Sequence, residues 1–126
     1  MHRKKILLVD DSSTILMMEK FVLRNDPFLL LTASSGEEAV RKAAAEKPDL
    51  ILLATNMPRM SGVETWRVMR AMEDLAHVPV LFITPGGECT HVTREWKDGR
   101  TDFVTKPINA LELLAKVRQL LGNSPS

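Results

Sequence analysis

The chain has 126 residues, of which 44% are hydrophobic and 26% charged, so we expect one globular domain with a real core. Lys and Arg total 17 against 16 Asp and Glu, and this near balance argues against a dedicated nucleic-acid-binding protein. No apolar run reaches the roughly 18 residues that span a membrane. Cys89 is the only cysteine, which excludes an internal disulfide and favours a reducing, cytoplasmic setting.

Five short apolar runs are predicted to be strands: residues 5–10, 28–33, 49–54, 78–84 and 101–106. The first four are nearly continuous in Leu, Ile, Val and Phe. Continuous rather than alternating apolarity is typical of strands that are buried on both faces, as in a parallel sheet.

Longer amphipathic segments separate these runs and are predicted to be helices. Three of them begin with a capping residue placed three before a Glu, at Ser35, Ser61 and Asn109. In a capping box of this kind the two side chains satisfy backbone donors of the first turn. A further helix near residues 89–98 is expected to be the weakest, because β-branched residues occupy it and no capping box precedes it.

The helix after the first strand is expected to face the core through Ile15, Met18 and Val22. Met17 and Met18 are interpreted as core filler rather than as a binding surface.

The alternation of strands and helices predicts an α/β fold with a doubly wound, five-stranded parallel sheet of order 2-1-3-4-5, flavodoxin-like, with five flanking helices. We expect a single domain over residues 1–126, with a core at about 4–121 and a frayed tail at 122–126. Ligands of such sheets bind beyond the carboxyl ends of the strands.

Polar side chains follow several of these strand ends. Asp10 and Asp11 end the first strand, Thr84 ends the fourth and Lys106 ends the fifth. Adjacent carboxylates favour a hard cation such as Mg²⁺, and a hydroxyl with an ammonium group suits a phosphoryl group. Each residue alone has an ordinary structural explanation, as a helix cap or a solvated side chain. Their joint arrival at adjacent strand ends favours a site.

The segments "ILLVDDSST", "PDLILLATNMPRMSG", "VPVLFIT" and "DFVTKP" resemble, in order and spacing, the receiver domains of bacterial two-component response regulators, especially the single-domain chemotaxis type. The resemblance covers Lys4 to Leu121 and implies the same fold. It implies that Asp10 and Asp11 hold Mg²⁺ with the backbone carbonyl of Asn56, and that Thr84 and Lys106 contact the phosphoryl group.

The resemblance also assigns Phe103 to the aromatic switch position of the fifth strand. Pro107 matches the proline that follows the lysine, where a cis Lys-Pro bond is usual. Pro58 and Gly62 fit the family's loop after the third strand.

Ala54 stands where the family has the Asp that accepts a phosphoryl group from a histidine kinase. Alanine has no oxygen with which to accept it, so phosphorylation at position 54 is excluded by the residue type. Binding of Mg²⁺ is expected to weaken, because one anionic ligand is missing.

Two explanations of Ala54 remain open. In one, the chain is a natural pseudo-receiver that keeps the fold without the phosphorylation switch. In the other, it is a phosphoacceptor response regulator carrying an engineered Asp-to-Ala change. The retained strand-end residues favour the second explanation. Pro85 and Arg100, where the family usually has Ala, favour the first, towards which we lean slightly.

The output is expected to be contact with another protein, a histidine kinase or a downstream signalling protein, without direct nucleic-acid or membrane binding. In the family the fourth helix, fifth strand and fifth helix make such contacts. Candidate contact residues here are Arg94, Trp96, Arg100 and Phe103, and Trp96 is either a partner anchor or a packing residue.

A small nucleotide- or flavin-binding enzyme on the same fold is a remote alternative. It needs a phosphate loop after the first strand, but residues 10–13 read Asp-Asp-Ser-Ser, which repels phosphate in the absence of a metal. "TPGGEC" after the fourth strand fits no phosphate-binding pattern. The chain is therefore not expected to be an enzyme.

Overall fold

The structure is a computed structural model that describes residues 3–85 and 100–122. The elements in chain order are β1 (Lys5–Val9), α1 (Ser13–Leu23), β2 (Leu29–Ala33), α2 (Gly36–Glu46), β3 (Leu50–Ala54), α3 (Gly62–Arg70), β4 (Val80–Thr84), β5 (Thr101–Thr105) and α4 (Ala110–Gly122). Each strand lies within the run predicted for it.

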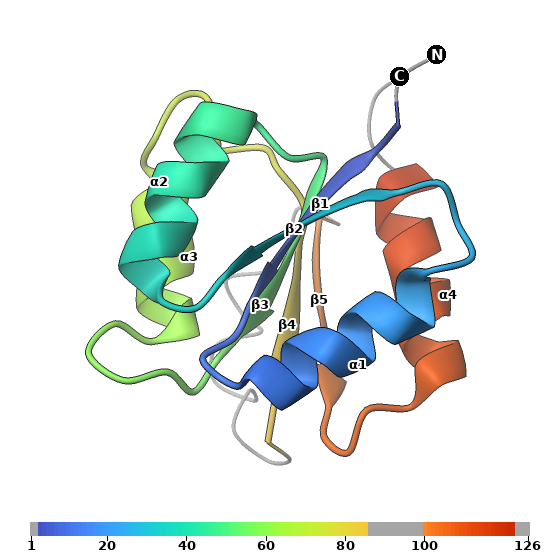
Figure 1. Cartoon of the computed structure of the whole chain (residues 1–126). Helices are drawn as coiled ribbons and strands as arrows, with labels where there is room; N and C mark the ends of the chain where they lie inside the picture. Colours follow the sequence, from blue (N-terminus) through green and yellow to red (C-terminus); the bar gives the residue numbers. More distant parts are fainter. Residues whose placement is uncertain (1–2, 86–99, 123–126) are drawn as a thin grey trace.

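The strands form one parallel sheet of order β2-β1-β3-β4-β5, which confirms the predicted topology. Leu7 in β1 pairs with Leu31 on one side and Ile51 on the other. Helices α2 and α3 cover one face of the sheet, and α1 and α4 cover the other (Figure 1). The described residues contain four helices, because the fifth, expected near residues 89–98, lies outside them.

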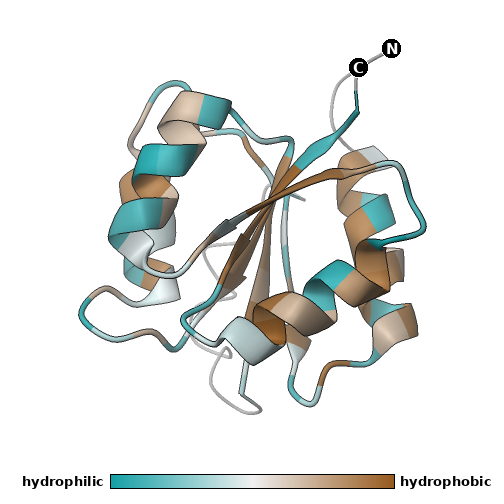
Figure 2. Cartoon of the chain, in the orientation of Figure 1, coloured by the Kyte–Doolittle hydropathy of each residue, from teal (hydrophilic) through white to brown (hydrophobic). Residues whose placement is uncertain are grey.

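The central strands are buried on both faces, as their continuous apolar sequence predicts. Every residue of β3 and β4 is buried. Figure 2 shows these strands as the most hydrophobic part of the molecule, between helices of mixed character. On the α2–α3 face, the ring of Trp66 packs edge-on against Phe82, with 6.1 Å between ring centroids. Among the described helices, none is both long and apolar enough to cross a membrane.

Only one of the three predicted capping boxes is complete. Ser61 and Glu64 satisfy each other's backbone N–H groups at the start of α3. At α2, Ser35 accepts from the backbone N–H of Glu38, but the Glu38 carboxylate turns to the residue before the cap, Ser34. At α4, Asn109 caps the helix while the Glu112 carboxylate lies 3.8 Å from Lys116. A competing partner therefore determines the orientation of the Glu38 and Glu112 carboxylates, which do not bond back to the cap residue.

The predicted core-facing stripe of α1 was wrong at Met18, whereas Val22 is half-buried and packs against the core. Met17 and Met18 are 70% and 41% exposed, so they are not core filler. The residues that α1 buries are Glu19 and Leu23. Successive residues of a helix point about 100° apart, so the orientation that buries Glu19 turns Met18 away from the sheet.

Candidate functional site

The carboxyl ends of four strands place four sequence-distant residues on one edge of the sheet. Ala54 at the end of β3 pairs with Ile83 in β4, and Thr84 pairs with Thr105 in β5. Asp10 follows β1, the other neighbour of β3. We refer to Asp10, Ala54, Thr84 and Lys106 as the strand-end site.

Ala54 is 1% exposed, and its methyl group belongs to the hydrophobic cluster on the α2–α3 side of the sheet. The chain then loops back so that the Gly62 N–H donates to the Thr55 carbonyl over 3.0 Å. A Cβ atom at position 62 would lie only 2.0 Å from the Ala54 carbonyl oxygen. This close approach of two backbones explains why the loop needs a glycine at Gly62.

Asp10, which follows β1 next to β3, is buried with 1% of its surface exposed. Its Oδ1 accepts from the Ser12 N–H over 2.9 Å, whereas its Oδ2 has no hydrogen-bond partner in the described part of the chain. Burial raises the pKa of Asp10, while the Ser12 N–H and the Lys106 ammonium oppose the rise. Asp10 thus holds a desolvated oxygen that a cation would stabilise.

Lys106 and Thr84 are tied together by the backbone, since the Lys106 N–H donates to the Thr84 carbonyl over 2.8 Å. The Lys106 ammonium lies 4.0 Å from Asp10 Oδ2. The Thr84 hydroxyl is buried and donates to the Pro85 carbonyl over 3.0 Å. The Lys106–Pro107 peptide bond is cis, as the resemblance implied.

Two further predicted site residues, Asp11 and Asn56, are exposed at the same edge of the sheet, after β1 and β3. Across residues 3–85 and 100–122, no group of three His, Cys, Asp or Glu side chains lies close enough together to hold a metal ion. Any cation here would therefore draw on carbonyl oxygens or water as well as the two carboxylates.

Sequence reasoning missed Glu19, which is fully buried within range of the charges of Asp10 and Lys106. The signal was present, because Glu19 lies three residues after Leu16 and four before Leu23, on one stripe of α1. Carboxylates are rarely buried, so the apolar pattern favours Met18 over Glu19 at the core.

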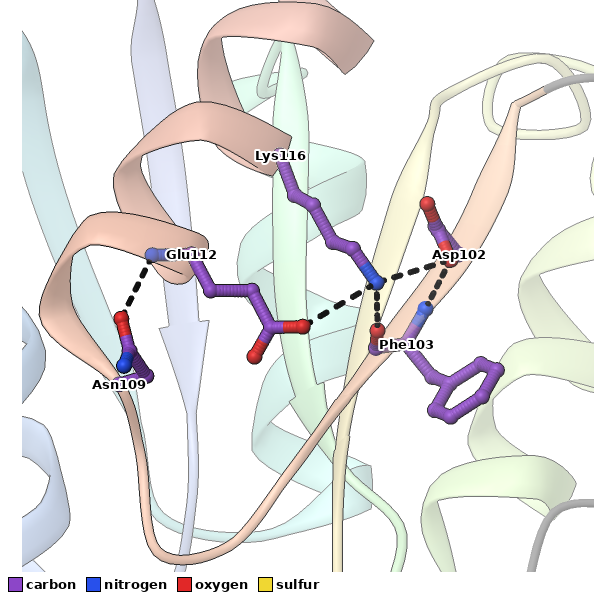
Figure 3. Close-up of polar contacts among 5 residues, drawn as sticks. All are labelled: Asp102, Phe103, Asn109, Glu112 and Lys116. Carbon is purple, nitrogen blue, oxygen red and sulfur yellow. Dashed lines mark hydrogen bonds and ion pairs between the residues drawn. The ribbon is translucent and has the colours of Figure 1, made fainter.

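A cluster of polar contacts around Lys116 joins β5 to α4 (Figure 3). The Lys116 ammonium donates to the Phe103 carbonyl over 2.7 Å and lies 3.5 Å from Asp102 Oδ1, 3.8 Å from Glu112 Oε2 and 5.3 Å from the centre of the Phe103 ring. These contacts link the backbone of β5 to α4, while the half-buried side chain of Phe103, the expected switch residue, packs against the hydrophobic cluster on the α2–α3 side of the sheet. Arg100 lies just before β5 and is half-buried, while Arg94 and Trp96 lie outside the described residues.

Comparison with known proteins identifies the class to which this fold and strand-end site belong. The family model for the response regulator receiver domain matches residues 6–118, and the chain belongs to that family. It is 36% identical over 121 residues to the alkaline phosphatase synthesis transcriptional regulatory protein PhoP of Bacillus subtilis, covering 96% of this chain and 50% of PhoP. The chain therefore spans about half the length of that relative.

Solved structures give the same result. The signal receiver domain of a Luxo repressor protein from Vibrio parahaemolyticus superposes with a TM-score of 0.86 at 28% identity, covering 96% of this chain and 92% of that one. The receiver domain of sensor histidine kinase PA1611 from Pseudomonas aeruginosa has a TM-score of 0.83 at 27% identity, covering 97% and 100%. That structure holds a magnesium ion in its active-site cleft. Receiver domains are signalling modules of two-component systems.

Proposed function

We propose that this chain is a pseudo-receiver: a signalling module that acts through contact with other proteins and is not phosphorylated at position 54. The single observation that carries the proposal is Ala54, buried at the end of β3 between the strand ends that bear Asp10 and Thr84. A methyl group has no oxygen for a phosphoryl group. The family match over residues 6–118 supports one receiver unit over about residues 4–121.

The strand-end site retains groups that fit a divalent cation. Asp10 supports this most directly, because its Oδ2 is buried without a hydrogen-bond partner among the described residues. Asp10 and Asp11 would hold Mg²⁺ with their carboxylates and Asn56 with its backbone carbonyl. The cation would supply positive charge beside Thr84 and Lys106. With alanine at position 54 one anionic ligand is lost, so we expect weaker binding than in a receiver with an Asp there.

A second candidate function is a phosphoacceptor response regulator in which an Asp at position 54 was replaced by engineering. The pairing of Lys106 with Asp10 and the buried Thr84 hydroxyl favour it, because both groups remain where phosphoryl chemistry would use them. Codon 54 of the source genome distinguishes the two candidates: an alanine codon supports the natural pseudo-receiver, and an aspartate codon the engineered receiver.

Labelling with acetyl phosphate tests the proposal. The chain, Ala54→Asp and the uncharged control Ala54→Asn are incubated with acetyl phosphate and Mg²⁺, and intact-mass spectrometry detects the acyl phosphate. We expect no labelling of the chain or of Ala54→Asn. Labelling of Ala54→Asp would show that the other strand-end groups still work, and its absence would indicate a deeper loss of the chemistry. Stable labelling of the unaltered chain would overturn the proposal.

We further propose that partner proteins, a histidine kinase or a downstream signalling protein, contact the side formed by β5 and α4. The fixed position of Phe103, through the contacts of Lys116, supports a surface of defined shape there. Arg100 borders it, and Arg94 and Trp96 are the expected additions. Replacement of Trp96 by Ala should weaken partner binding with little loss of stability if Trp96 is an anchor, whereas a large stability loss would indicate packing.

A further inference from the structure

Helix α1 packs on the sheet through a stripe whose central residue is an acid. Glu19 has no exposed surface, and it lies between Leu16 and Leu23 along the stripe. Neither oxygen of its carboxyl group has a hydrogen-bond partner in the described parts of the chain. A buried carboxylate without partners is costly, so its charge state decides whether this packing is favourable.

The surroundings of Glu19 are almost entirely apolar. The hydrophobic cluster on this side of the sheet combines β1, β3 and β4 with Leu113, Val117 and Leu120 of α4. Strands β3 and β4 contain no titratable residue. While α1 remains packed against the sheet, an ionised Glu19 carboxylate has neither water nor a hydrogen-bond donor among the described residues to stabilise its charge.

Two charged groups act on Glu19 from a distance: Asp10 after β1 and Lys106 after β5. The cations of the facing helix α4 are engaged elsewhere, Lys116 with carboxylates of β5 and α4, and Arg118 with one in the α1–β2 connection. Burial, together with the negative charge of Asp10, raises the pKa of Glu19 to about 8, against a smaller opposing effect of Lys106. Glu19 is consequently protonated at neutral pH.

We propose that Glu19 is a proton-controlled latch for α1: the uncharged carboxyl group allows the helix to pack on the sheet, and loss of its proton releases the helix. The ionised group reaches water only if α1 moves away from the apolar cluster. Local opening of one helix costs less than unfolding of the whole domain, so this helix opens first.

Release of α1 would also change a surface. An apolar groove of about 410 Å³ lies between α1 and the start of α4. Met17 and Phe21 form one wall, and Ile108 and Ala110 form the other. Because the two walls belong to different elements, movement of α1 separates them. The proton on Glu19 thus controls whether this groove exists, whatever the origin of Ala54.

Hydrogen exchange of the full chain, in EDTA between pH 6 and 9, tests the latch. The intrinsic exchange rate at each pH, divided by the observed rate, gives the protection factor of α1 (residues 13–23). Helix α2 (residues 36–46), which has the same length and lies on the other face of the sheet, is the control. We expect α1 protection to fall roughly tenfold to a hundredfold over this range. Above pH 8, α1 should be less protected than α2.

Two variants separate Glu19 from every other titrating group. Glu19→Gln keeps the size without the charge, and Glu19→Leu completes the apolar stripe, so α1 protection should be independent of pH in both. If the Gln variant does not fold, the Leu variant alone serves the comparison. The latch is overturned if α1 protection of the unaltered chain is constant, if it falls equally in the variants, or if α1 and α2 lose protection together at every pH.

Discussion

Helices α1 and α2 have 11 residues each and lie on opposite faces of the same sheet, yet they bury different chemistry. Helix α2 buries Gly36, Ala39 and Ala43, which have no charge to lose or gain. Helix α1 buries Glu19 and Leu23. The comparison teaches that two helices with similar roles in one fold can differ in whether their packing depends on pH.

The largest expected effect is on the α2–α3 face. Trp66→Ala removes a ring that is 4% exposed and packs on Phe82, so we expect a loss of about 3–5 kcal/mol in the free energy of unfolding. The lost contact is apolar, and the loss should therefore be the same at pH 6 and pH 9. Urea unfolding followed by circular dichroism measures it. A loss that changes by more than about 1 kcal/mol between these pH values would remove the contrast between the faces.

Glu19→Leu on the opposite face should instead stabilise the protein. The pKa of Glu19 is raised from 4.5 to about 8 in the fold, so the folded state holds a proton that the unfolded chain releases. Stability therefore falls as pH rises from about 4.5 to about 8, by roughly 3 kcal/mol at pH 7. The variant should gain this amount in urea unfolding at pH 7 and much less at pH 4.5. An equal gain at both pH values would contradict the assignment.

Ala54→Asp should lower stability in the absence of Mg²⁺, by on the order of 1–2 kcal/mol at neutral pH. The new carboxylate would add to the charges of Asp10 and Asp11 beside a single ammonium, that of Lys106. Mg²⁺ should restore the loss. Thermal melts with Mg²⁺ or EDTA measure both effects, and Ala54→Asn controls for side-chain size. Identical melts of the unaltered chain and Ala54→Asp would refute the expected repulsion.

The smallest expected effect concerns the ion pair that ties α4 to the α1–β2 connection. Arg118 contacts Asp26 through two hydrogen bonds of 2.8 and 3.0 Å, and this pairing lowers the pKa of Asp26. Arg118→Ala should cost little stability, because the Arg118 side chain is 57% exposed and ion pairs at the surface contribute little. The difference should disappear in about 1 M NaCl. The matched control is Arg41→Ala, which replaces an exposed arginine of α2. A loss of stability for Arg118→Ala that does not change with salt would indicate lost packing instead.

The central strands were predictable because apolar runs indicate burial, and their order because strands alternate with helices in a doubly wound pattern. Residues 49–54 and 78–84 are continuous in large aliphatic side chains, and such runs have few alternatives to a doubly buried strand. The capping boxes were less predictable. Ser61 and Glu64 form the expected pair, but Glu38 and Glu112 take other partners that only the folded chain brings within reach.

The sequence alone determined the fold class and that a methyl group stands at position 54, since Ala54 ends a continuous apolar run. The tertiary structure decided which side of α1 is buried, because α1 carries apolar residues on more than one side and its packing on the sheet selects the side with Glu19 and Leu23. It also decided that Asp10 keeps one oxygen without a hydrogen bond, 4.0 Å from Lys106, among the residues it describes. Burial and charge distance depend on groups far apart in sequence, and no local pattern encodes them.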